Sequence, residues 1–153
     1  MTATDTATVI TVVFHSEFHY ARTLEEVDAL VRRIVEDPPR PVCAVYVWDR
    51  PCRGHFEPGG PAFPTGRLRV STSPATGWGA LNYVDRDRPD GALVDSFNPD
   101  AGPATPVLPL DTNGIDFPAS ASLPLEKVRE AIAEYCRTGA RPTCVQWQLG
   151  EWY

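Results

Sequence analysis

Two continuous segments of apolar and β-branched residues constrain the fold of this 153-residue chain more than any other feature. They cover Val9–Phe14 and Val42–Trp48. Successive side chains of a strand point to opposite faces, so a run without alternating charged or strongly polar residues is typical of a strand buried on both faces. We therefore expect these two segments to lie side by side near the centre of a covered sheet.

Two helices are predicted, one between these strands and one near the C-terminus. Thr23-Leu-Glu-Glu26 has the spacing of a capping box, and apolar residues then recur at helical spacing as far as Asp37-Pro-Pro39. Proline disfavours helical backbone at the residue before it, which ends the first helix there. The second helix is predicted from Pro124, which suits a first helical turn, to Gly139, which suits a C-terminal stop.

The remaining segments predict a largely antiparallel sheet. Residues 48–66 are rich in Pro and Gly and predict a long loop. Short strand-like segments follow, separated by residues that favour turns. These segments are Leu68–Ser71, Gly79–Val84, Ala92–Phe97, Val107–Leu110 and Thr143–Leu149. Asp90-Gly91 predicts one hairpin connection, and Asn113-Gly114 predicts a second hairpin at an edge over residues 107–117. We expect an α+β fold, with one domain over residues 1–153, a curved sheet and two helices packed on it.

Charge and composition exclude several functional classes. The net charge is −6, and an acidic surface repels the phosphate backbone, so we expect no direct nucleic-acid binding and favour a basic protein partner. Arg67 and Arg69, like Arg32-Arg33, lack interleaved aromatic residues, so we interpret them as part of a solvated face. No apolar run approaches the ~20 residues of a membrane span, and the N-terminus lacks a secretory signal. A cytoplasmic monomer with reduced cysteines and no cofactor is expected.

One candidate metal site competes with a binding function. His15-Ser-Glu17 and Pro51-Cys-Arg-Gly-His55 resemble the zinc deaminase signature, in which His and Cys hold the metal and Glu moves protons. The second Cys of that signature is His55 here, and neither segment is predicted to open a helix as the signature requires. A small zinc-dependent hydrolase or deaminase using His15, Glu17, Cys52 and His55 therefore remains an alternative, but we predict no metal site and no enzyme activity.

The strongest candidate for a contact surface is acidic and aromatic. Carboxylates gather around the predicted hairpin tip after residue 84, and aromatic residues flank the same strands. Carboxylates speed encounter with a cationic protein, and rigid rings anchor it. The predicted partner-binding residues are Asp85, Asp87, Asp90, Asp95, Trp78, Tyr83 and Trp48.

Four segments from residue 79 onward form a recognisable pattern: Gly79–Asp85 (GALNYVD), Asp116–Pro118 (DFP), Leu123–Arg129 (LPLEKVR) and Glu134–Trp147 (EYCRTGARPTCVQW). With these segments, the chain resembles the first-numbered immunity-protein family of bacterial polymorphic toxin systems. The T-G-x-R-P…V-x-W ending is the most specific of them. Before residue 79, the chain resembles the family only in its order of strand, helix and strand.

The resemblance implies a small cytoplasmic protein that binds and neutralises a cognate secreted toxin. Members of the family are often encoded beside deaminase-fold toxins or other nuclease-type toxins. A toxin that acts on nucleic acid needs a cationic groove, and an acidic protein can occupy that groove without doing chemistry. A regulatory scaffold domain with a partner other than a toxin is the second alternative.

Overall fold

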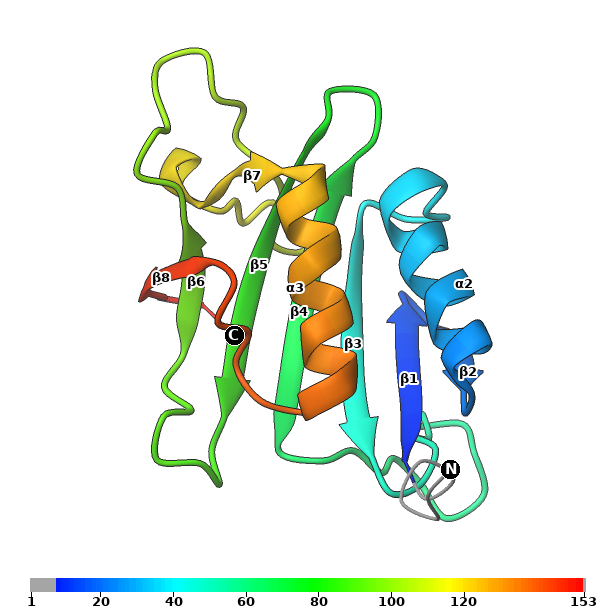
Figure 1. Cartoon of the computed structure of the whole chain (residues 1–153). Coiled ribbons are helices and arrows are strands. Elements are labelled where there is room, and N and C mark those ends of the chain that lie inside the picture. The colour runs from blue at the N-terminus through cyan, green and yellow to red at the C-terminus, as the bar shows by residue number, and fades with distance from the viewer. Residues whose placement is uncertain (1–7, 153) are drawn as a thin grey trace.

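The computed structural model describes residues 8–152, which form a single eight-stranded sheet with two α-helices (Figure 1). Its main strands are β1 (Val9–Phe14), β2 (Glu17–Ala21), β3 (Val42–Trp48), β4 (Gly66–Ser73), β5 (Trp78–Asp85), β6 (Val94–Phe97) and β8 (Gln146–Leu149). Their order across the sheet is β2-β1-β3-β4-β5-β6-β8, and the short β7 (Leu123–Pro124) pairs with β5. Every pairing is antiparallel, so the α+β prediction is confirmed.

The two apolar segments form neighbouring strands inside the sheet, as predicted. β1 and β3 have the predicted bounds, and their register places Val12 opposite Val45. The strand β2 was not predicted. It folds back on β1 through a tight turn, where His15 adopts a left-handed φ of 57°. Glu17–Ala21 is only partly buried, because it is an edge strand, and it therefore lacks the apolar run that identified its neighbours.

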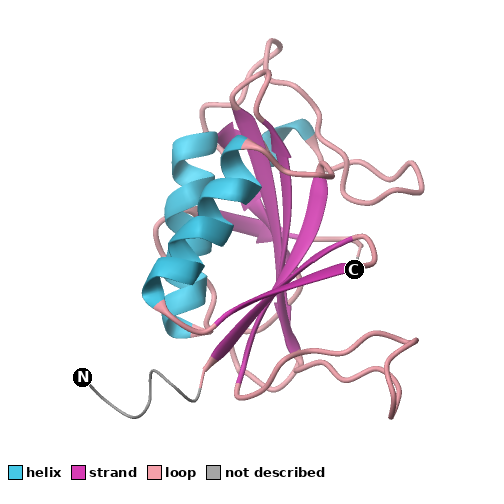
Figure 2. Cartoon of the chain, turned by 90° about the vertical axis from the view of Figure 1, so that its right-hand side faces the viewer, coloured by secondary structure: helices cyan, strands magenta, loops and turns pink. Residues whose placement is uncertain are grey.

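The two α-helices, α2 (Leu24–Glu36) and α3 (Leu125–Thr138), lie side by side on one face of the sheet (Figure 1; Figure 2). The capping box is present, because the Thr23 hydroxyl accepts from the Glu26 N–H while the Glu26 carboxylate accepts from the Thr23 N–H. Pro124 is the N-cap of α3, and Gly139 ends it in a left-handed conformation with φ 68°. Both predicted helices are confirmed. Within residues 8–152, no helix is long and apolar enough to cross a membrane.

The main core lies between the helices and the sheet. Its largest fully buried side chains include Tyr83 on β5, Leu68 on β4, and Ile132 and Tyr135 on α3. Gly79 allows this close packing, because a Cβ there would lie 2.9 Å from both the Ser71 carbonyl oxygen and the Val128 Cγ2. The helices therefore pack directly on one face of the sheet.

The opposite face is covered by loops only at its ends. Residues 49–65 bring Phe63 onto Tyr46, with ring centroids 5.0 Å apart, and the Cys52 N–H donates to the Thr11 hydroxyl. Toward the other end, a second cluster packs on Ala80 and Trp78, and it consists of Leu108, Leu110, Phe117, Ala121 and Ile115. Figure 2 shows loops projecting on the side away from the helices, at both ends of the sheet.

Three predicted strands are shorter in the structure. The strand predicted over Ala92–Phe97 starts only at Val94. Val107–Leu110 was predicted as a strand of an edge hairpin, but only Pro109 and Asp116 form a β-bridge there. The chain still reverses as a hairpin does, because the Leu110 N–H donates to the Ile115 carbonyl. Prolines 106 and 109 have no N–H group for a ladder, which limits the pairing. The last strand starts at Gln146 rather than Thr143, because the Thr143 and Cys144 N–H groups donate to the Glu134 carboxylate.

Candidate functional site

The sheet face opposite α2 and α3, which we call the open face, carries a polar strip between the two loop regions. Strand register decides which side chains lie there. Leu68 pairs with Tyr83 and Val45, which all point into the helix-covered core. The residues next to these along each strand point to the opposite face of the sheet. The open face therefore comprises Tyr46, Arg67, Arg69, Asn82, Val84 and Asp95.

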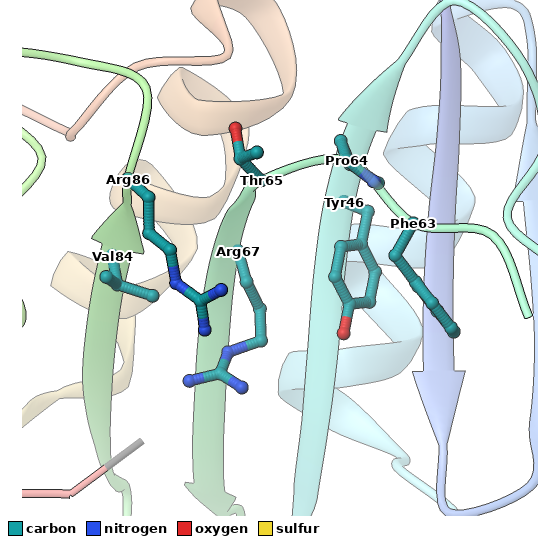
Figure 3. Close-up of a pocket in the computed structure, with 7 residues that line it drawn as sticks. All are labelled: Tyr46, Phe63, Pro64, Thr65, Arg67, Val84 and Arg86. Atoms are coloured by element: carbon teal, nitrogen blue, oxygen red, sulfur yellow. The ribbon is translucent and has the colours of Figure 1, made fainter.

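A pocket of about 370 Å³ lies on the open face where β3, β4 and β5 end. Its lining residues are Tyr46, Phe63, Pro64, Thr65, Arg67, Val84 and Arg86. Figure 3 shows the guanidinium groups of Arg67 and Arg86 close to one another, beside the rings of Tyr46 and Phe63. The pocket thus combines two cationic groups with an aromatic wall.

A smaller pocket of about 200 Å³ continues along the same face and contains Arg69. Burial, followed by the nearby charge of Arg67, lowers the pKa of Arg69 to about 10, so Arg69 stays charged at neutral pH. Its guanidinium also donates to the Leu110 carbonyl at 3.5 Å. Arg67 and Arg69 were predicted to belong to a solvated face. That prediction was wrong, because loops and neighbouring strands cover both side chains in part.

The predicted acidic hairpin tip is present, and hydrogen bonds to the buried carboxylate of Asp85 hold it in place. Asp85 is only 8% exposed, and its carboxylate accepts from the Thr65 hydroxyl at 2.8 Å and the Asp87 N–H at 3.0 Å. Gly91 closes the turn, since a Cβ there would lie 1.8 Å from the Asp85 carbonyl oxygen. Asp87 and Asp90 are exposed on the outside of this turn, which we call the 85–91 turn. Two of its three carboxylates can therefore reach a partner.

The other predicted contact residues are not gathered at this turn. Tyr83 is fully buried in the helix-side core, so its ring supports α3 and does not project to a partner. Asp95 lies on the open face, 4% exposed, and accepts from the Asn82 side-chain amide at 2.9 Å. Burial raises the pKa of Asp95, partly offset by that hydrogen bond. Trp78 packs beside the cluster of residues 108–121, and Trp48 stacks with the Arg50 guanidinium 4.7 Å from its ring centroid.

The structure does not bring the four candidate zinc ligands together. His15 lies in the β1–β2 turn, and the Glu17 carboxylate accepts a hydrogen bond from the His19 ring. Cys52 is buried, and its backbone N–H donates to the Thr11 hydroxyl. Burial raises the pKa of the Cys52 thiol. Across residues 8–152, no three His, Cys, Asp or Glu side chains are grouped closely enough to hold a metal ion.

The segment after α3 fixes the last strand and the 85–91 turn. Glu134 accepts from the N–H and hydroxyl of Thr143, at 2.7 and 2.9 Å, and from the Cys144 N–H at 3.2 Å. The Arg141 guanidinium donates to the Asp90 carbonyl at 3.4 Å, and the Trp147 indole donates to the Pro142 carbonyl at 2.8 Å. These contacts connect the end of α3 to both β8 and the turn.

The sequence model of the family described as Immunity protein Imm1 matches residues 15–149. The chain belongs to the Imm1 family. The match confirms the resemblance seen from residue 79 onward, and it extends through α2 and β3, where only the order of elements was similar. A comparison with curated proteins found no match. Membership makes the chain an immunity protein of a toxin system, with a toxin as its partner.

The Imm1 segments quoted from the sequence mainly build the scaffold of the site. Gly79, Leu81 and Tyr83 face the helices, and Asp85 organises the 85–91 turn. The open-face arginines Arg67 and Arg86 lie outside those segments, and sequence reasoning did not assign them to a site. For Arg67, the signal in the sequence is the alternation Arg67-Leu-Arg69, which puts two charges on one face of a strand. Arg86 has no such signal.

Proposed function

We propose that this Imm1 protein acts in the cytoplasm and neutralises a secreted toxin that acts on nucleic acid, a deaminase or a nuclease, by occupying its active-site groove. Membership of the Imm1 family carries the proposal. The net charge of −6 supports the type of target, because a protein that binds phosphates offers a cationic groove that an acidic protein can enter. Inhibition by occupancy requires no chemistry from the inhibitor.

The exposed carboxylates of the 85–91 turn are the proposed substitutes for substrate phosphates. Asp87 and Asp90 project from a turn that is held from inside by Asp85 and from behind by Arg141. A turn already fixed in its binding conformation loses little conformational entropy on association, which favours tight binding. Arg86 and Arg88 partly neutralise the negative charge of the turn. We therefore expect the turn to steer and orient the toxin and not to supply most of the affinity.

Trp48, Trp78 and Asp95 complete the proposed contact set in different roles. Trp48 is partly exposed at the end of β3 and can offer its ring to the toxin, and Trp78 can do the same at the far end of the open face. Asp95 and Tyr83 are buried, so their role is to stabilise the strands that carry the contact residues. Effective protection requires an affinity in the nanomolar range or tighter, with an interface on the order of 1,600 Å².

The proposal is tested with the toxin domain encoded immediately upstream of this chain. We expect its expression alone to arrest growth, and co-expression of the chain to restore growth through a stable complex. Arrest that continues in the presence of the folded chain contradicts neutralisation. A stable complex with a neighbour that is not toxic supports a regulatory scaffold instead.

The contribution of the turn is measured by association kinetics at low salt. Asp87→Lys/Asp90→Lys is expected to slow association with the toxin by roughly tenfold and leave the melting temperature unchanged. Asp28→Lys/Glu130→Lys reverses two exposed carboxylates on α2 and α3 and serves as the matched control. Equal rates for the two variants would remove the 85–91 turn from the contact surface.

A further inference from the structure

We propose that the open face is a second toxin-contact surface, which receives an acidic segment of the toxin at Arg67, Arg69 and Arg86. The inference rests on the proposed function and deepens it by assigning a cationic surface beside the exposed carboxylates Asp87 and Asp90, with Arg86 at the start of the 85–91 turn as its edge. The toxin would then present both a cationic groove and a carboxylate-bearing segment to this chain.

Charge distribution is the first argument. The whole chain carries −6, yet three of its fourteen cationic side chains lie along one strip of the open face. Arg67 and Arg69 are two residues apart on one strand, which corresponds to a Cα separation of about 7 Å. Arg86 reaches toward Arg67 across the pocket (Figure 3). A carboxylate between them would reduce the repulsion among these charges.

Partial burial of these cations is the second argument. Arg67 and Arg69 are only partly exposed, and the rings of Tyr46 and Phe63 border the larger pocket. A charge beside low-dielectric walls interacts with an incoming carboxylate more strongly than a fully hydrated charge does. Arginine binds a carboxylate through two parallel N–H donors, so this strip selects planar anions such as Asp and Glu side chains.

Exposed aromatic residues of the loop that supplies Phe63 to the pocket are the third argument. Phe56 is 100% exposed and Phe63 is 40% exposed, both on the loop of residues 49–65 that borders the pocket. Exposed aromatic side chains beside arginines are the composition that protein–protein contact surfaces favour. The aromatic residues would bury apolar area on the toxin while the arginines fix its orientation.

A nucleic acid is the competing anion, and the chain's overall charge argues against it. Phosphates would meet the open-face arginines favourably, but a chain of net charge −6 repels an extended polyanion that runs past this short strip. A protein segment carrying two or three carboxylates avoids that repulsion, because the rest of the protein need not be anionic.

The experiment measures the dissociation constant between the full chain and the toxin domain encoded immediately upstream. The test variant is Arg67→Gln/Arg86→Glu. If this variant has a lowered melting temperature, Arg86→Glu alone is used as a second variant, because Arg86 is at an exposed position. The matched control is Arg32→Glu/Arg33→Gln on α2. We expect the test variant to weaken binding by roughly 100-fold, Arg86→Glu by roughly tenfold and the control by less than twofold.

The outcomes separate the inference from the proposed function. A wild-type chain that does not bind the toxin overturns both. A wild-type chain that binds and neutralises the toxin, with a folded Arg86→Glu variant equal to the α2 control, overturns the inference alone. Binding of a 12-nucleotide single-stranded DNA by the wild type, lost in the Arg86→Glu variant, would assign the open face to nucleic acid and also overturn the inference.

Discussion

The two faces of the sheet are built by opposite means. On the helix-covered face, α2 and α3 bury residues such as Tyr83 and Ile132 completely. On the open face, two loop regions cover the ends of the sheet and leave Arg67, Arg69 and Tyr46 in shallow pockets between them. One face consequently determines the fold, whereas the other carries the chemistry that a partner can recognise.

This division explains why the sequence identifies the family more readily than the contact surface. The Imm1-like segments supply Gly79, the helix α3 and the Glu134 contacts, all of which stabilise the scaffold. Exposed positions of the open-face loops, such as Phe56, are not packed in either core, so substitutions there cost the fold little. Such a surface can be matched to one toxin without loss of the fold.

The largest effect is expected in the helix-side core. Ile132→Ala removes a fully buried side chain between α3 and the sheet, and we expect it to lower the free energy of unfolding by about 3 kcal/mol. Urea denaturation measures this change. Toxin affinity of the folded fraction should stay as in the wild type, and a selective loss of affinity with little loss of stability would contradict the division between the faces.

Close packing of α3 on β5 predicts the next effect. Gly79→Ala places a methyl group 2.9 Å from the Ser71 carbonyl oxygen and the Val128 side chain, and we expect a loss of about 2 kcal/mol as the helix is displaced. Gly102→Ala is the control, because a Cβ there has no neighbour within 4 Å. The melting temperature of Gly79→Ala should lie clearly below that of Gly102→Ala. Equal melting temperatures would show that α3 can shift without loss of stability.

A smaller, pH-dependent effect is expected at Glu134. Burial raises the pKa of this carboxyl, but hydrogen bonds from Thr143 and Cys144 outweigh it and hold the pKa below its usual 4.5. A lowered pKa stabilises the fold above pH 4.5, and this stabilisation is lost as the pH falls through the folded-state pKa. Glu134→Gln should therefore cost about 1 kcal/mol at pH 7 and almost nothing near pH 3.

Melting temperatures of wild type and Glu134→Gln, measured from pH 7 to pH 3, check this expectation. A difference of about 3 °C at pH 7 should shrink steadily toward zero. A difference that does not change with pH would show that the carboxylate charge contributes nothing to the contact between α3 and β8.

The smallest effect on stability is expected at the tip of the long loop. Phe56 is fully exposed, so Phe56→Ser should change the free energy of unfolding by less than about 0.5 kcal/mol. The same substitution should weaken toxin binding by roughly tenfold, since it removes an exposed aromatic side chain from the loop that also supplies Phe63 to the pocket. Unchanged affinity would exclude this loop tip from the contact.

The strongly periodic elements of this fold could be predicted from the sequence, and the open face could not. Val9–Phe14, Val42–Trp48 and the capping box at Thr23 act locally, so their signals survive without tertiary information. The prediction for Asp85 identified the right turn but not its burial, because a turn aspartate can point inward or outward with the same sequence.

The arginine strip depends on long-range pairing. Arg86 meets Arg67 only because β4 and β5 pair in antiparallel register, and Phe63 reaches Tyr46 only because the loop of residues 49–65 folds back on β3. Nothing in the local sequence specifies these contacts. For the same reason, the edge strand β2 and the shortened strand β8 were missed or misplaced.

Hydrogen exchange of the chain with and without its toxin tests the central claim most directly. The account predicts that binding slows exchange in the loop of residues 49–65 and in the 85–91 turn, while exchange in α2 and α3 stays unchanged. Protection concentrated on the outer surfaces of α2 and α3, with both loops unaffected, would contradict it.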